Sequence, residues 1–180
     1  MVALLPSGPD QERNASRLVY FAGIASARER CYLTSPYFIP DEAVTSALVS
    51  AAMRGVDVRV LVPERCDVRV AGAAARSYYP ALVRSGVRIF EYRRSMLHTK
   101  TMVVDGAWSI AGSANVDIRS FGLNFELGAL VVDPSFAQGL EGRFLGELED
   151  STEMTSSDLA ARPFLQRLAQ KTARLLSPLL

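Results

Sequence analysis

The sequence contains one histidine and two cysteines, and its positive and negative charges almost cancel. Cys31 and Cys66 are far apart and lack metal-ligand spacing, so we interpret both as reduced thiols of a cytoplasmic protein. The formal net charge of +1 gives no global attraction to nucleic acid, although a local basic site is compatible with it. The lone imidazole, His98, is therefore the candidate for chemistry near neutral pH.

Long apolar runs are also missing. No stretch reaches the roughly 20 residues that a transmembrane helix needs. The apolar part of the opening MVALLPSGPD is too short for a signal peptide, and Pro6 interrupts it. Any contact with a membrane is therefore expected from its surface or through a partner.

What the sequence does have is typical of one globular domain: 180 residues, of which 49% are hydrophobic and 22% charged. Periodicity predicts helices over residues 10–30, 41–54, 68–85, 134–148 and 158–176. Strands are expected over residues 31–35, 56–62, 87–92, 97–105, 107–113 and 124–133, with an irregular loop at 36–40 and a connector at 152–157. Early alternation of helices and strands, followed by hairpin-linked strands, predicts an α/β fold with a mixed sheet and helices on both faces.

Residues 98–105, HTKTMVVD, place the histidine two positions before a lysine. On a strand, residues two apart point to the same face with Cα atoms roughly 6.5 Å apart, so His98, Lys100 and Met102 are expected together. An imidazole beside an ammonium suits an anion between them, because the lysine can hold negative oxygens while the imidazole attacks phosphorus. Taken alone, a strand histidine is more often a packed or surface residue, and a lysine is usually a solvated charge.

The hairpin turn expected at Asp105 returns the chain to GSAN, residues 112–115. Ser113 and Asn115 are again two apart and offer neutral hydrogen-bond donors for phosphate oxygens, and Gly112 lets a backbone approach closely. Separately, Asp105 is ordinary turn chemistry and GSAN is a common loop string. Together these residues form HxK, four residues, D, six residues and GSxN, a spacing too specific for coincidence.

This pattern resembles the signature of the phospholipase D superfamily, matched in full by His98, Lys100, Asp105, Gly112, Ser113 and Asn115. Flanking stretches are similar to the C-terminal half of bacterial cardiolipin synthases: TSPYFIPDE (34–42), AAMRGVDVRVLVP (51–63), residues 87–126 and LLSPLL (175–180). The likeness begins at about residue 6 and covers nearly the whole chain. It implies one phospholipase D-like domain over residues 1–180, forming half of a two-motif enzyme.

The resemblance also implies a mechanism that needs no metal or other cofactor. A histidine of one motif attacks phosphorus to form a phosphohistidine, and a histidine of a second motif protonates the leaving alcohol and then deprotonates the acceptor. Lys100, Ser113 and Asn115 would stabilise charge on the phosphoryl oxygens. By position, Glu126 matches the acidic residue that holds the catalytic histidine in its working tautomer, with an ordinary strand-edge charge as an equal alternative. Asp105 would have a supporting, structural role.

The sequence departs from the two-motif enzymes because it carries one motif and one histidine. The second motif is expected from a paired copy of the chain or from a missing N-terminal half. Such a half-domain should expose an apolar patch when alone. The implied substrate is a phospholipid, phosphatidylglycerol above all, met at the cytoplasmic side of the bacterial membrane. Hydrolytic phospholipase D, a phosphodiester nuclease and a catalytically silent half-domain remain alternatives, with nucleic acid disfavoured by the charge.

Two further features admit two interpretations each, and a third has one expected role. The last helix carries Arg167, Lys171 and Arg174 on one stripe with leucines opposite, so it either lies on an anionic membrane surface or, as is commoner and favoured here, covers the core. Residues 37–38 form either a packed aromatic loop or a lipid-facing entrance. Asp117 and Arg119 are expected to form a structural ion pair.

Overall fold

The computed structural model describes residues 1–10 and 14–175. In this part of the chain eight strands form one mixed sheet in the order β1-β9-β7-β6-β2-β4-β5-β10, and β3 pairs with β8. The strands are β1 (Val2–Ser7), β2 (Arg30–Thr34), β3 (Phe38–Ile39), β4 (Asp57–Pro63), β5 (Arg88–Tyr92), β6 (Thr101–Val104), β7 (Trp108–Gly112), β8 (Val116–Asp117), β9 (Glu126–Val131) and β10 (Ser151–Glu153). Within the large sheet, β2, β4 and β5 are parallel and the remaining pairings are antiparallel.

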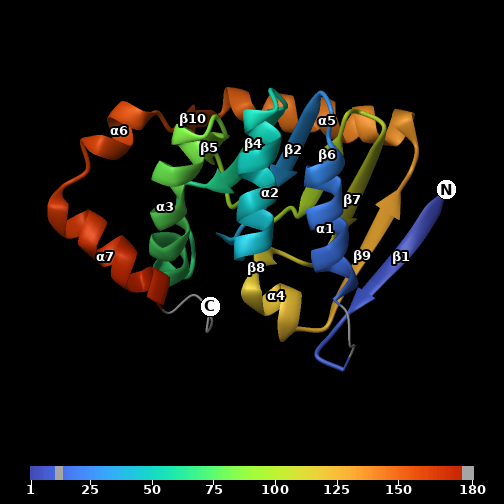
Figure 1. Cartoon of the computed structure of the whole chain (residues 1–180), viewed down its shortest axis with the longest axis horizontal. Helices are drawn as coiled ribbons and strands as arrows, with labels where there is room; N and C mark the ends of the chain where they lie inside the picture. The colour runs from blue at the N-terminus through green and yellow to red at the C-terminus, as the bar shows by residue number, and fades with distance from the viewer. Residues whose placement is uncertain (11–13, 176–180) are drawn as a thin grey trace.

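Helices lie on both faces of this sheet (Figure 1). They are α1 (Ala15–Ser26), α2 (Glu42–Met53), α3 (Arg69–Arg84), α4 (Ile118–Gly122), α5 (Pro134–Glu149), α6 (Ser156–Ala160) and α7 (Phe164–Leu175). In Figure 1, α1, α2 and α3 cover the face toward the viewer and α5 crosses the opposite face. The predicted α/β class with a mixed sheet between helices is confirmed.

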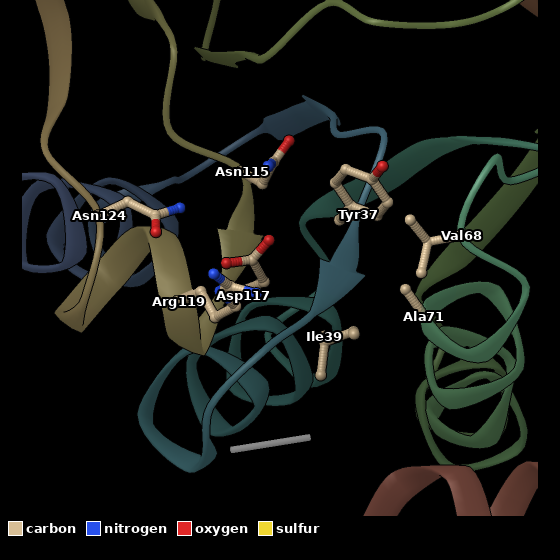
Figure 2. A pocket seen from close by; sticks show the side chains of 8 residues that line it. All are labelled: Tyr37, Ile39, Val68, Ala71, Asn115, Asp117, Arg119 and Asn124. Atoms are coloured by element: carbon tan, nitrogen blue, oxygen red, sulfur yellow. The ribbon is translucent and has the colours of Figure 1, made fainter. Parts of the chain in front are cut away.

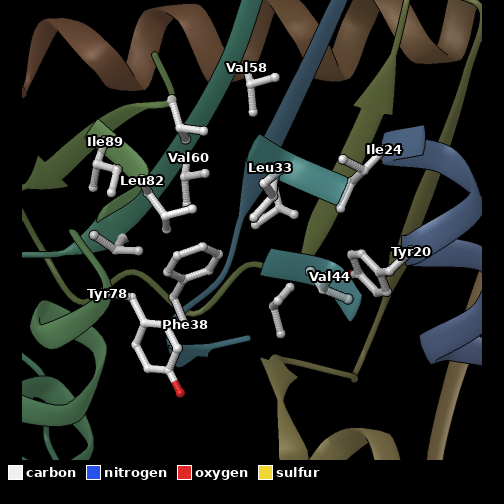
Figure 3. Packing of buried hydrophobic residues seen from close by; sticks show 14 of the residues in the cluster. Tyr20, Ile24, Leu33, Phe38, Val44, Val58, Val60, Tyr78, Leu82 and Ile89 are labelled. Carbon is white, nitrogen blue, oxygen red and sulfur yellow. The ribbon is translucent and has the colours of Figure 1, made fainter. Parts of the chain in front are cut away.

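Two apolar clusters fill the space on either side of the sheet. The larger one joins the strands to α1, α2 and α3, and its fully buried members include Ile24, Leu33, Val44, Val60, Leu82 and Ile89 (Figure 3). The smaller one lies under α5, where Tyr32 stacks on Phe144 at a centroid separation of 4.9 Å. Leu97 belongs to this second cluster, so the residue before His98 is anchored in the core.

Helix ends follow the predicted capping chemistry in most cases. Asp41 caps α2 by accepting from the Val44 N–H at 2.8 Å, and Gly55 follows the helix with φ +89°. The first helix is shorter than expected: Asn14, not Asp10, caps it, and it ends at Ser26. The last expected helix is divided into α6 and α7, because Pro163 between them has no N–H to continue the ladder. Its final predicted residue, 176, lies outside the described residues.

Five short elements were not predicted. β1 forms an edge strand on β9 despite Pro6, which an edge position tolerates. β3 lies within the expected loop at 36–40, β10 overlaps the expected connector at 152–157, and β8 and α4 follow the GSAN segment. These elements have two to six residues each, too few for periodicity to identify.

Candidate active site

The segment that carries His98 is not a strand, contrary to prediction. β6 begins only at Thr101, so His98 and Lys100 are not related by strand alternation. The His98 side chain is exposed, whereas Lys100 is buried and its Nζ donates to the His98 carbonyl at 2.8 Å. The Lys100 side chain therefore bonds the carbonyl that would accept a backbone hydrogen bond if the strand continued. The last backbone hydrogen bond between the two segments runs from the Gly112 N–H to the Lys100 carbonyl at 3.2 Å. The structure thus connects Lys100 to His98 through the backbone carbonyl and not through the imidazole ring.

Several carboxylates influence the amine of Lys100. Burial is the largest influence on its amine and lowers its pKa, while Glu126, Asp117 and Asp67 act in the opposite direction. The three acidic residues come from β9, β8 and the loop before α3, so the fold gathers them around one cation. An anionic ligand that binds Lys100 would therefore compete with these carboxylates for the buried amine.

Ser113 and Glu126 form a second contact, where β7 ends and β9 begins. The Ser113 hydroxyl donates to the Glu126 carboxylate and accepts from the Leu127 N–H at 3.0 Å. The Ser113 N–H donates to the Leu127 carbonyl at 3.0 Å, and Asn124 Nδ2 donates to Glu126 at 3.4 Å. Glu126 is thus held by Ser113 and Asn124 and has no recorded hydrogen bond to His98. Its orienting role remains a prediction.

Asn115 leaves one polar atom unpaired. Its backbone N–H and its Nδ2 both point to the Ser120 hydroxyl, at 3.2 and 3.5 Å. Its Oδ1 is buried and has no hydrogen-bond partner. A buried polar atom without a partner is costly, so the Asn115 amide is a candidate for contact with a ligand.

That amide lines a cavity of about 220 Å³. The complete lining is Tyr37, Ile39, Val68, Ala71, Asn115, Asp117, Arg119 and Asn124. Figure 2 shows the polar side chains of β8 and α4 on one side and the apolar Val68 and Ala71, at the start of α3, on the other. A wall of each kind suits a ligand with a polar group attached to an apolar body.

On the polar side of this cavity, the predicted ion pair between Asp117 and Arg119 does not form. Asp117 caps α4 by accepting from the Ser120 N–H at 2.6 Å, and no salt bridge to Arg119 is recorded among the described residues. Burial raises the pKa of Asp117, and the Ser120 N–H only partly offsets it. Tyr37 donates its hydroxyl to Asp67 at 2.6 Å, while Phe38 is fully buried in the core. Of the two aromatic residues, only Tyr37 reaches the cavity.

Asp105 lies at the other end of β6, away from His98. Its carboxylate accepts from three backbone N–H groups, those of Arg28, Glu29 and Arg30, at 3.0, 2.8 and 2.9 Å. Asp105 and Gly106 have φ of +52° and +61°, the conformation of the predicted hairpin turn. The structure thus gives Asp105 a structural position, in line with the supporting role expected of it.

Two general features of the described residues bear on chemistry. No group of three or more His, Cys, Asp or Glu side chains is arranged to hold a metal ion in the part of the chain that the structure covers. Across the same residues, no helix combines the length and apolarity needed to cross a bilayer.

Solved structures share this arrangement. A phospholipase D family member, Nuc from Salmonella typhimurium, superposes with a TM-score of 0.72 at 23% identity, covering 87% of this chain and all of that one. Phosphatidylserine synthase from Haemophilus influenzae gives a TM-score of 0.77 at 17% identity, covering 99% of this chain and 47% of the other. The fold is therefore that of a phospholipase D-like domain.

The sequence comparison narrows this class. A family model described as cardiolipin synthase, PLD-like domain, matches residues 20–147, and the chain belongs to that family. It is 42% identical over 179 residues to a cardiolipin synthase of Alkalihalophilus pseudofirmus and 47% identical over 176 residues to cardiolipin synthase A of Pseudomonas putida. These matches cover 99% and 98% of this chain but only 36% and 37% of the relatives, in their C-terminal part. The resemblance inferred from the sequence is confirmed.

Proposed function

We propose that this chain carries out phosphatidyl transfer in cardiolipin synthesis, contributing one of the two motifs that a complete site needs. The observation that carries the proposal is the complete signature at residues 98–115 within a chain more than 40% identical to named cardiolipin synthases. An exposed His98 side chain and a buried Lys100 amine bonded to the His98 carbonyl support it, because the nucleophile must reach a lipid while the amine needs protection from water.

In the proposed reaction, His98 attacks the phosphorus of phosphatidylglycerol. The bond from phosphorus to the glycerol oxygen breaks, and a histidine of the second motif donates a proton to the leaving glycerol. The phosphatidyl group then stays on the imidazole as a phosphohistidine. A glycerol hydroxyl of a second phosphatidylglycerol loses its proton to the second histidine and attacks phosphorus, which releases cardiolipin and frees His98.

Three neighbouring groups are proposed to stabilise the charge on the phosphoryl oxygens. Lys100 supplies the amine; burial lowers its pKa, and the nearby Glu126, Asp117 and Asp67 oppose that shift. Ser113 supplies a hydroxyl that can turn from Glu126 to the ligand. Asn115 supplies an amide; half a turn about its last side-chain bond would direct the NH₂ group into the cavity and the oxygen to the Ser120 hydroxyl.

The cavity beside Asn115 is proposed as the place of the glycerol headgroup. Its polar wall offers acceptors and donors for hydroxyl groups, namely Asp117, Arg119 and Asn124. The volume of about 220 Å³ suits a group of this size and not a second acyl chain.

The second histidine is proposed to come from a second motif, carried either by a paired copy of the chain or by the remaining part of the longer proteins that this chain resembles. The site's surroundings support such a pairing. Leu123, Phe125 and Leu127 flank Glu126 and are 57%, 74% and 54% exposed. An exposed apolar surface of this kind supports the proposed pairing. We further propose that the chain works as a peripheral protein on the cytoplasmic side of the membrane.

The test compares two substrates. Purified chain is incubated with labelled phosphatidylglycerol in vesicles and, separately, with plasmid DNA. Cardiolipin plus free glycerol is the expected product. Phosphatidic acid would indicate hydrolysis, nicked DNA a nuclease, and no reaction at any protein concentration a silent half-domain.

The matched control is His98→Asn, which removes the nucleophile at an exposed position. The variant should keep the unfolding temperature of the wild type and lose all turnover. Turnover that survives the change would mean that another group, or a contaminant, performs the reaction.

A further inference from the structure

The apolar side chains of α7 point away from the rest of the protein. α7 packs against α3, and the residues it buries are Gln170 and Ala173 (Figure 1). Its large apolar residues Phe164, Leu165, Leu168 and Leu175 are 68%, 76%, 48% and 79% exposed. Successive helical residues are about 100° apart, so these four form one stripe opposite the buried pair. A surface helix normally turns such a stripe to the core. α7 does cover α3, through Gln170 and Ala173, but the described leucines that the favoured sequence interpretation placed against the core are exposed.

Basic side chains border this stripe. Arg167 and Lys171 lie along one side of it and, with Arg84 of α3, line a cavity of about 370 Å³. None of these three cations has a carboxylate within salt-bridge distance among the described residues. Other arginines of the described residues do have one, such as Arg76 with Glu91. The charge next to α7 is therefore uncompensated.

We propose that α7 is a docking surface for an anionic lipid bilayer. Its apolar stripe would enter the boundary between headgroups and acyl chains, while Arg84, Arg167 and Lys171 bind lipid phosphates. An apolar stripe flanked by basic residues is the pattern of helices that lie in the plane of a membrane. Charge decides against the obvious rival: two copies of the chain joined symmetrically through α7 would bring their basic residues together. The exposed phenylalanine and leucine side chains argue against nucleic acid as the ligand. Its phosphates would bind the cations but would leave these apolar side chains without a partner.

This surface is separate from the proposed chemistry. None of the signature residues lies on α7, so the docking surface can be present in a chain that catalyses nothing, and catalysis can fail without affecting it. A binding assay on the His98→Asn chain therefore tests the surface alone.

The experiment measures partition of His98→Asn chain onto vesicles by sedimentation. Equal mixtures of phosphatidylglycerol and phosphatidylcholine are compared with phosphatidylcholine alone. We expect clear preference for the anionic vesicles and weakening as salt increases. Equal binding to both vesicles, or binding to DNA in place of vesicles, would overturn the proposal.

Two double variants separate the apolar and the charged contributions. Arg167→Glu with Lys171→Glu should lower partition onto anionic vesicles at least about 25-fold, since each basic residue near such a surface is worth about fivefold. Leu165→Gln with Leu168→Gln should lower it at least about tenfold. All four side chains are exposed, so the unfolding temperature should not change.

Matched controls carry the same changes elsewhere on the surface. Arg28→Glu with Arg143→Glu alters the net charge equally, and Leu18→Gln with Met53→Gln removes equally exposed apolar groups from α1 and α2. The controls should bind as the parent chain does. If the α7 variants bound like their controls, α7 would not be the docking surface.

Discussion

Individual signature residues divide between chemistry and architecture. His98, Lys100 and Asn115 present an exposed ring, a buried ammonium and an unpaired amide oxygen, all of which a ligand could use. The Asp105 carboxylate instead accepts hydrogen bonds from three backbone N–H groups at the start of β2. Spacing alone cannot distinguish these roles, because both kinds of residue recur at fixed positions in a motif.

Replacement of Asp105 tests its structural role. Asp105→Ala removes the acceptor for three N–H groups and places alanine at φ +52°, so we expect a loss of about 2–4 kcal/mol of unfolding free energy. Asp105→Asn keeps one acceptor oxygen and a residue that tolerates this conformation, and should lose about half as much. Urea unfolding at pH 7 measures both. Equal losses would show that the negative charge, not the hydrogen-bond geometry, matters.

The stability difference between wild type and Asp105→Ala should depend on pH in a defined way. Burial alone would raise the pKa of Asp105, but the N–H groups of Arg30, Glu29 and Arg28 more than offset it, and the net pKa is lowered. A carboxylate with a lowered folded pKa contributes stability above its unfolded pKa of about 3.9, and that stability disappears as the pH falls through the folded pKa. The difference between wild type and Asp105→Ala should therefore be constant from about pH 7 to 5 and shrink below about pH 4.

Among the secondary-structure elements, the β7–β9 pair fixes the polar groups of GSAN. Gly112 lies opposite Gly128, and a Cβ on Gly112 would come 2.6 Å from the Gly128 Cα and 2.7 Å from the Leu127 carbonyl oxygen. The close approach that the sequence predicts at Gly112 is thus an approach to β9. It brings Ser113 to the Leu127 backbone and to Glu126.

Substitution of Gly112 should disturb both the sheet and the site. Gly112→Ala forces backbone apart at a paired position and should cost about 1–3 kcal/mol of unfolding free energy. Turnover should fall more than stability predicts, because Ser113 moves with the strand. The control is Gly139→Ala in α5, where no atom lies within 4 Å of the added Cβ; it should gain about 0.4–1 kcal/mol. Urea unfolding of the two variants decides, and a harmless Gly112→Ala would contradict the packing argument.

The elements that sequence patterns predicted are those with strong local signals. α2 has a capping aspartate and a terminal glycine, and the β6–β7 turn has Asp–Gly. The predicted start of β6 was wrong. A side-chain contact from Lys100 to the His98 carbonyl replaces the strand hydrogen bonds there, and no periodicity encodes such a contact. The cavity was not predicted because its lining comes from segments around residues 37, 70 and 120, which only the tertiary fold assembles.

The whole molecule presents half of the machinery that the proposed reaction requires. One histidine cannot serve as nucleophile for phosphorus and as proton donor to the leaving oxygen in the same step. The His98 side chain and the apolar residues beside Glu126 are exposed, so both are accessible to the second motif that we propose. Function is therefore expected to be a property of an assembly.

Turnover by the isolated chain should accordingly require two copies. Wild type and His98→Asn are mixed in varying ratios at a fixed total concentration, and phosphatidylglycerol turnover is measured. If each working site needs a histidine from both copies, random pairing makes the rate fall as the square of the wild-type fraction, to about one quarter in an equal mixture. Specific activity should also rise as the wild-type chain is concentrated, in step with the dimer fraction found by sedimentation. A rate of one half in the equal mixture, with constant specific activity, would mean that each chain works alone and that a group other than a second histidine protonates the leaving alcohol.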